Sequence, residues 1–512
     1  MIMSIMKTLL LPLDERPCNR LFPQLISQSS HNIELLVPDK SILGDKKRPA
    51  DMAMISQFLR DHVHDCTNVI ISVDTLVYGG LIPSRLHYLT KEEAFQRLEV
   101  LKELKSLNHN VKIYAFNCIM RTPQYDSSDE EPDYYAEHGF ALFRRKYLLD
   151  YQERHGLSEA EITELAAIDV PEDVIADYEK RRDFNTDVNL EVIDYLGRGI
   201  IDFLVIPQDD SSPYGYTALS QKRVTHAIQE KKLDFKAMVY PGADEVALSL
   251  LTRAYHEFCG FEPTFYPYYA SVLGPTIVPL YEDRPMAESL KAHLRVCRAK
   301  LALHPDKADF ILAINSPGRA VQDTYDEAFD ISYGSYRNLL DFCYQIRDFI
   351  AAGKKVALCD SAFCNGGDFQ LIRYLDELDV LDRLCSYAGW NTNCNSLGTV
   401  LAQACFGSNL PNLLYRIIED VCYQADVRHD IINHDLEKLG VGDDDVAAKL
   451  GEVEALIKEK LERCYSSLKI SKKHPVKIKD VYLPWQRMFE IGMEIEADST
   501  FTYVQRSIAT RL

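Results

Sequence analysis

The chain has 512 residues, of which 46% are hydrophobic and 26% are charged, and this composition is typical of a globular protein. Its formal net charge of -20 and its pI near 5.2 argue against a nucleic-acid partner and against binding to an anionic membrane surface. No stretch is long and apolar enough to span a membrane, so no membrane partner is expected.

The amino terminus and the cysteines indicate a cytoplasmic protein. The first apolar run is short, breaks at Pro12 and leads straight into Asp14 without a small-residue cleavage site, so it is interpreted as a strand rather than a signal peptide. Thirteen cysteines occur without regular spacing and without a CxxC pair. This pattern predicts reduced, buried thiols and no structural zinc site.

Short apolar runs alternate with amphipathic segments along the chain. The runs expected to form strands are Leu9–Leu13, Glu34–Val37, Val69–Val73, Val111–Phe116, residues 202–208, Phe235–Tyr240, Pro263–Ala270, Asp309–Ile314, Lys354–Cys359 and Ser386–Ala388. Helices are predicted over Ala50–His64, Lys91–Leu107 and Val246–Cys259. The alternation predicts an α/β fold with a mainly parallel sheet, with a (β/α)8 barrel as the first choice and two doubly wound halves as the alternative.

Two regions depart from this alternation. Residues 127–190 are acidic, rich in tyrosine and helical in pattern, which predicts a helical insertion that serves either as a solvated flap or as a lid. From residue 409 onward the pattern is mostly helical, strongly so over Leu450–Leu461, with a small strand or hairpin expected near Phe489–Val504. The expected division is therefore an α/β catalytic domain over residues 1–408 and a helical carboxy-terminal region over residues 409–512.

Most predicted strands end in a carboxylate or a carboxamide. These residues are Asp14, Asp39, Asp74, Asn117, Asp209, Asp210, Asp244, Glu245, Asn315, Asp360 and Asn391. Because the carboxyl ends of parallel strands share one edge, we expect a ring of acids and amides around a single opening. Such groups bind sugar hydroxyls in pairs, and Tyr78, Tyr214 and Trp390 would pack on the apolar faces of sugar rings.

The strongest candidates for chemistry are the adjacent acids Asp209 and Asp210, which end the run of residues 202–208. Such a pair is similar to those of enzymes that use the substrate's own acetamido group as nucleophile: one acid orients the amide and the other protonates the leaving oxygen. Asp244 and Glu245 form a second pair, in which close like charges would keep one group protonated. The alternative for either pair is a cap of the following turn or helix.

The remaining candidates are predicted to bind substrate at the same edge. They are Asp14, Arg16, Asn19, Asp74, Tyr78, Arg85, Arg121, Tyr214, Asp360, Asn365, Asp368, Trp390 and Asn391. For each arginine, structural salt bridging is the alternative to binding a substrate acid. No HExxH, GxGxxG, GxxxxGK[ST] or GxSxG pattern occurs near these strand ends, so neither a metal nor a cofactor is predicted.

Four of these segments carry a family resemblance. Residues 11–19 (LPLDERPCN), 74–85 (DTLVYGGLIPSR), 208–210 (QDD) and 387–392 (YAGWNT) resemble the motifs of a bacterial family of domains of unknown function. The resemblance covers essentially the whole chain. It implies an association with gene neighbourhoods for glycan breakdown in Gram-positive bacteria, and it supplies no catalytic residues.

The sequence therefore favours a cytoplasmic glycoside hydrolase that acts on a small imported saccharide, including one that bears an N-acetylhexosamine. A metal-dependent hydrolase or isomerase of a sugar-like substrate is one alternative, since hard cations also bind acidic rims. A non-catalytic sugar-binding module is the other alternative.

Overall fold

The computed structural model describes residues 5–326 and 328–497, and these residues form two compact units. Unit 1 draws its described residues from Met1–Phe265, Pro275–Ala308 and Leu397–Phe406. Unit 2 draws them from Tyr266–Gly274, Asp309–Ser396 and Gly407–Leu512. This division differs from the expected break between residues 408 and 409. Strands that follow residue 265 form a second sheet, and most of that sheet belongs to the same unit as the carboxy-terminal helices.

Unit 1 is built on a parallel sheet of six strands. They are β1 (Met6–Leu11), β2 (Ile33–Leu36), β3 (Asn68–Ser72), β4 (Lys112–Phe116), β5 (Phe203–Gln208) and β6 (Ala237–Pro241). The order is β2-β1-β3-β4-β5-β6, and every neighbouring pair is parallel. The α/β class with a mainly parallel sheet is thereby confirmed. All six carboxyl ends lie at one edge of this sheet.

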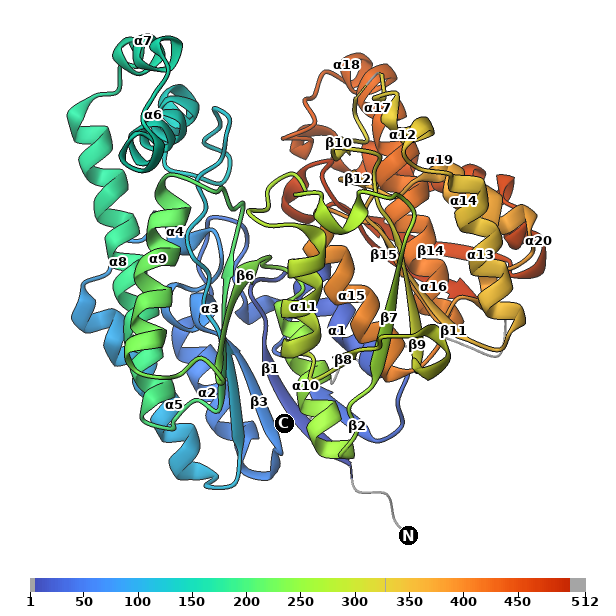
Figure 1. The fold of residues 1–512 in the computed structure, drawn as a ribbon. Coiled ribbons are helices and arrows are strands. Elements are labelled where there is room, and N and C mark those ends of the chain that lie inside the picture. The colour runs from blue at the N-terminus through green and yellow to red at the C-terminus, as the bar shows by residue number, and fades with distance from the viewer. Residues whose placement is uncertain (1–4, 327, 498–512) are drawn as a thin grey trace. The chain divides into compact units, whose positions relative to one another are not determined.

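Helices cover both faces of the first sheet (Figure 1). They are α1 (Pro17–Ser27), α2 (Met52–His62), α3 (Val73–Tyr78), α4 (Pro83–Leu86), α5 (Lys91–Leu107), α9 (Tyr216–Glu230), α10 (Val246–Cys259) and α11 (Met286–Val296). Alternate strand residues such as Leu9 and Leu11 form one continuous core with Leu98 of α5 and Val224 of α9. The central strands β3, β4 and β5, together with β1, are mostly buried, which explains why they read as apolar runs.

The helical insertion predicted over residues 127–190 lies between β4 and β5. It consists of α6 (Tyr135–His155), α7 (Glu159–Ala167) and the first half of α8 (Glu172–Gly197). Tyr135 and Tyr178 form a small separate core with Met120 and Tyr216. The second half of α8 belongs to the main core through Val192 and Leu196, since two parallel neighbouring strands need a crossover helix between them. The insertion is therefore an extension of that crossover.

Unit 2 contains most of a second sheet, whose strand order is β13-β11-β9-β7-β8. The strands are β7 (Thr264–Tyr269), β8 (Lys300–Leu301), β9 (Phe310–Asn315), β11 (Lys355–Asp360) and β13 (Ser386–Ala388). The β9–β11 and β11–β13 pairs are parallel. Two sheets with separate strand orders correspond to the predicted alternative of doubly wound halves.

The helices of unit 2 lie between and after the strands of this sheet in the chain, and the last α-helix among the described residues ends at Lys473. They are α12 (Ser332–Ser335), α13 (Leu339–Ala351), α14 (Phe369–Glu377), α16 (Leu410–Arg416), the π-helix η6 (Ile417–Val427), α17 (Arg428–His434), α18 (Leu436–Leu439), α19 (Leu450–Ser467) and α20 (Ile470–Lys473). A further helix, α15 (Asn393–Phe406), passes from unit 2 into unit 1.

Two short strand pairs complete unit 2. β10 (Gln322–Asp323) pairs in parallel with β12 (Phe363–Cys364). β14 (Val476–Tyr482) and β15 (Gly492–Ala497) form an antiparallel pair, so β15 falls within the predicted hairpin region, of which residues 498–504 lie outside the described part of the chain. Among the described residues, no helix combines the length and the apolar character needed to cross a membrane.

Candidate active site at the carboxyl edge of the first sheet

The loops that follow β1 and β6 meet over the carboxyl edge of the first sheet. Arg16 Nη2 donates hydrogen bonds to Asp14 Oδ2 at 2.7 Å and to Asp244 Oδ1 at 2.6 Å. Asn19 Nδ2 donates to the same two carboxylates, at 2.9 Å each. Three strands separate β1 from β6, so this contact shows that the loops bend across the sheet edge. Asp14, Arg16, Asn19 and Asp244 are therefore one cluster, as the strand-end pattern predicts.

Asp74 lies in the first turn of α3, directly after β3. Its carboxylate accepts hydrogen bonds from the Cys118 backbone N–H at 2.9 Å and from Asn117 Nδ2 at 3.3 Å. Burial raises the pKa of Asp74 to about 6, even though both hydrogen bonds favour the ionised form. Burial likewise raises the pKa of Asp244 to about 6, against the lowering effect of the Arg16 guanidinium. The edge thus holds carboxyl groups that are protonated in a weakly acidic solution.

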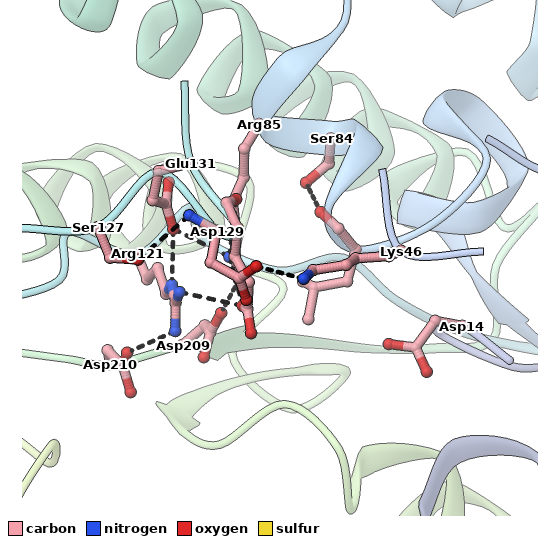
Figure 2. Close-up of polar contacts among 12 residues, drawn as sticks. Asp14, Lys46, Ser84, Arg85, Arg121, Ser127, Asp129, Glu131, Asp209 and Asp210 are labelled. Carbon is pink, nitrogen blue, oxygen red and sulfur yellow. Dashed lines mark hydrogen bonds and ion pairs between the residues drawn. The ribbon is translucent and has the colours of Figure 1, made fainter. Parts of the chain in front are cut away.

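Asp209 and Asp210 follow β5 and are each held by a buried arginine (Figure 2). Arg85 Nη2 donates to Asp209 Oδ2 at 2.7 Å, and Arg121 Nη1 donates to Asp210 Oδ2 at 3.0 Å. Asp210 has a φ of +39°, in the left-handed region that residues other than glycine rarely adopt. Strained backbone of this kind is concentrated at functional sites.

Glu131 connects the two arginines. Its Oε1 accepts from Arg85 Nη1 at 2.9 Å and from Arg121 Nε at 2.8 Å, while its Oε2 is buried and has no partner among the described residues. Glu130 also pairs with Arg85, at 3.1 Å, and with Arg121, at 3.0 Å. The four carboxylates outnumber the two guanidinium groups, so the network holds an excess of negative charge.

This excess of negative charge favours the protonated forms of Asp209 and Asp210. Burial and the neighbouring Asp210 raise the pKa of Asp209. Burial also raises the pKa of Asp210, against the lowering effect of Arg121 and Arg85. The side chains of Asp209 and Asp210 are 16% and 21% exposed, whereas those of Asp14 and Asp244 are 4% and 6% exposed. Oδ1 of Asp209 and of Asp210 accepts no hydrogen bond within the described part of the chain. The pair is therefore more accessible than Asp14 and Asp244 at this edge.

Glu130 and Glu131 were missed in the sequence. They lie in the acidic run of residues 129–133, which has the composition of a solvated loop. A signal was nevertheless present, because Arg121 and Arg85 each required a buried counter-charge once they were placed near a strand end. Lys46 and Asp129 form an ion pair in the same region, and Lys46 also donates its backbone N–H to Glu15 at 3.0 Å.

Three predicted residues are placed elsewhere in unit 1. Glu245 has no exposed side-chain surface, and its carboxylate lies 3.2 Å from His293 Nε2 in the core. Tyr78 is buried against His87 and Phe184. The Tyr214 hydroxyl shares a hydrogen bond with His155 Nε2 at 2.8 Å, and the Tyr214 ring packs edge-on against aromatic rings of α6. None of these contacts involves Asp209 or Asp210.

The prediction that all these strand ends belong to a single sheet is wrong for the five remaining residues. Asp360, Asn365, Asp368, Trp390 and Asn391 belong to unit 2 and lie around the ends of β11 and β13. The reason is that the chain starts a second parallel sheet after residue 265, and strand-end residues in sequence order do not reveal to which sheet a strand belongs.

These unit 2 residues form a second polar edge. Asp360 accepts from Asn315 Nδ2 at 2.8 Å, from the Tyr387 hydroxyl at 3.0 Å and from the Asp368 backbone N–H at 2.7 Å. Burial and the nearby Asp368 raise the pKa of Asp360 to about 7. Asn365 and Asn391 have φ values of +57° and +49°, and the Asn365 N–H donates to the Asn391 carbonyl at 2.8 Å. Trp390 is buried, with the Arg416 guanidinium 5.6 Å from its ring.

No group of three or more His, Cys, Asp or Glu side chains with metal-binding geometry occurs in the part of the chain that the structure describes.

Two comparisons bear on the identity of the chain. Residues 8–494 match the model of a family described as protein of unknown function (DUF4127). No curated protein matches the chain.

Proposed function

We propose that this chain, which belongs to the protein family of unknown function DUF4127, hydrolyses a glycosidic bond in a small saccharide. The observation that carries the proposal is the Asp209–Asp210 pair, two partly exposed carboxyl groups with raised pKa values at the carboxyl edge of a parallel sheet. Glycoside cleavage needs one carboxyl group that is protonated near neutral pH and a second one that is ionised.

The two ion pairs differ in a way that supports separate roles. Asp209 makes the shorter contact, 2.7 Å, with the fully buried guanidinium of Arg85, which favours its ionised form. Asp210 makes the longer contact, 3.0 Å, and is the more exposed of the two. In the proposal Asp210 is therefore the general acid, and Asp209 is the carboxylate that orients and stabilises the reacting group.

The proposed reaction proceeds in two steps on an N-acetylhexosaminide. The acetamido oxygen attacks the anomeric carbon while Asp210 donates its proton to the leaving oxygen, and the glycosidic bond breaks. Asp209 accepts a hydrogen bond from the acetamido N–H and stabilises the positive charge that develops there. Asp210, now ionised, then removes a proton from a water molecule that attacks the anomeric carbon, which restores the acetamido group and the protonated acid.

Two further features support a sugar substrate. The edge beside the pair carries Asp14, Asn19 and Asp244, whose oxygen and nitrogen atoms are suited to binding sugar hydroxyls. The motif resemblance adds an association with glycan-breakdown gene neighbourhoods. We extend the proposal to a cytoplasmic enzyme acting on an imported saccharide, in keeping with the reduced thiols of the thirteen cysteines.

A panel of aryl glycosides in both anomeric forms tests the proposal. We expect the purified protein to release the aryl group from at least one N-acetylhexosaminide, with a rate that a chelator leaves unchanged. Replacing the N-acetyl group by N-trifluoroacetyl should slow the reaction, because the less basic amide oxygen is a weaker nucleophile. Activity that is lost with chelator and restored by Mg²⁺, or no turnover of any sugar beside an active control enzyme, would reject it.

A further inference from the structure

A cavity in unit 1, with a volume of about 660 Å³, lies along β6, the edge strand of the first sheet. It is lined by the first residue of β5, by Met238 and Val239 of β6, and by side chains of α10 and α11. None of the residues assigned above to the carboxyl edge lines this cavity. The residues that line this cavity therefore need an explanation separate from that of the carboxyl edge.

The cavity lining is cationic in a chain whose formal net charge is -20. The basic residues are Arg253, Arg284, Lys291, Arg295, Arg298 and Lys300, and the acidic ones are Asp234, Glu262 and Glu288. A concave surface that gathers charge of one sign raises the local concentration of ions of the opposite sign. The cavity thus favours anions on a protein that otherwise repels them.

Part of this positive charge is not neutralised within the chain. Arg253 pairs with Glu257 and Arg284 pairs with Asp283, whereas Arg298 and Lys300 share the carboxylate of Glu262. Arg295 is exposed and forms no ion pair with any described residue. It lies one helical turn from Lys291 on α11, so the two side chains project from the same face of the helix. Lys291 pairs with Glu288 at 2.5 Å, but both side chains are 54% exposed, so an anionic ligand can compete with this weak surface pair. Arg295 has no such pair to displace among the described residues.

Apolar surface accompanies the charges. The Arg253 guanidinium stacks on the Phe203 ring, with 3.7 Å between the guanidinium carbon and the ring centroid. Phe235 is 96% exposed, although its side chain lines the cavity. Arginine binds phosphoryl groups through paired N–H donors, and exposed aromatic rings contact the organic part of a ligand. We infer that this cavity is a binding site for a small phosphorylated organic molecule.

The site has a direct connection to the Asp209–Asp210 pair. Arg284 lines the cavity and donates through Nη2 to Gln208 Oε1 at 2.8 Å, and through Nη1 to the Val239 carbonyl at 3.1 Å. Gln208 directly precedes Asp209. A ligand that draws Arg284 toward itself therefore acts on the end of β5. The binding site itself does not depend on the glycosidase proposal.

Calorimetric titration of the full chain with inorganic pyrophosphate tests the inference. We expect saturable binding to the wild type, and a Kd that is about tenfold higher or more in the Lys291→Ala/Arg295→Ala variant, since two charge-assisted contacts are lost. The control variant Lys449→Ala/Arg463→Ala removes two positive charges from unit 2, one directly before α19 and one within it, and should bind as the wild type does.

Three results would overturn the inference. They are the absence of saturable binding to the wild type, an equal loss of affinity in the control variant, and unchanged affinity in the Lys291→Ala/Arg295→Ala variant. Circular dichroism confirms that each variant is folded, and substitutions at such surface positions typically change stability little. A phosphorylated sugar and the unphosphorylated sugar, titrated in parallel, show whether the phosphoryl group is required.

Discussion

Replacing Asp210 with asparagine is expected to lower kcat for hydrolysis of an aryl N-acetylhexosaminide by about 10³-fold, the typical loss when a general acid is removed. Asparagine keeps the size of the side chain and can still accept the hydrogen bond from Arg121, but it cannot donate a proton to the leaving oxygen. KM should change little, because the interaction is lost only in the transition state. Steady-state kinetics with the substrate selected from the panel measures both constants.

The control for this substitution is Asp202→Asn, at the opposite end of the same strand. Asp202 pairs with Lys105 at 2.7 Å and lies directly before β5, remote from the carboxyl edge. Its replacement should leave kcat within about twofold of the wild type, as expected for a surface position. An Asp210→Asn enzyme that keeps wild-type kcat would remove Asp210 from the mechanism.

The pH profile gives a second readout for the same residue. Burial raises the pKa of Asp210, so the protonated form that the reaction needs persists to a higher pH than in an exposed aspartate. In the wild type, kcat should therefore fall as the pH rises through this raised pKa. Asp210→Asn should lose that limb of the profile, because the titrating group is gone.

Replacing Arg85 with methionine is expected to lower the free energy of unfolding at pH 7 by about 4 kcal/mol, the range measured when one partner of a buried ion pair is removed. The Arg85 side chain is 1% exposed and contacts the carboxylates of Glu131 and Asp209 at 2.9 Å and 2.7 Å. Methionine fills similar space but leaves these carboxylates without one of their counter-charges. Urea denaturation followed by circular dichroism measures the change.

Arg60→Met serves as the matched control for Arg85. Arg60 pairs with Glu103 at 2.8 Å, and both side chains are more than one third exposed, so the variant should lose less than about 1 kcal/mol. The deficit of Arg85→Met should also shrink as the pH falls, because protonation of Asp209, whose pKa is raised by burial, removes uncompensated charge. An equal, small loss in both variants would show that the buried network does not contribute to stability.

All strands of the two sheets except β8 were predicted, and most of them are buried and therefore read as short apolar runs. β8 has two exposed residues and was not predicted. Helices Lys91–Leu107 and Val246–Cys259 begin and end where their amphipathic patterns do. The assignment of strands to two sheets was not predictable, since a run such as Phe310–Asn315 has the same composition whichever sheet it joins. The crossover role of α8 was also hidden, because its first half belongs to the acidic insertion.

The part of the candidate site that directly follows the strands was predictable. Asp14, Asp209 and Asp244 lie at the carboxyl edge of one parallel sheet, as their positions after apolar runs indicate. Side-chain direction was not predictable: Glu245 follows Asp244 directly and yet points into the core toward His293. Glu131 was equally hidden, because its burial depends on a loop that returns to two arginines distant in the sequence.

The most direct test of the central claim is a crystal structure of the protein soaked with N-acetylglucosamine. The account predicts a sugar bound at the carboxyl edge of the first sheet, with a carboxylate oxygen of Asp209 or Asp210 within about 3.5 Å of the anomeric carbon or of the acetamido nitrogen, a distance at which direct contact is possible. A sugar held only by the residues around Asp360 in unit 2, with the Asp209–Asp210 pair untouched, would contradict it.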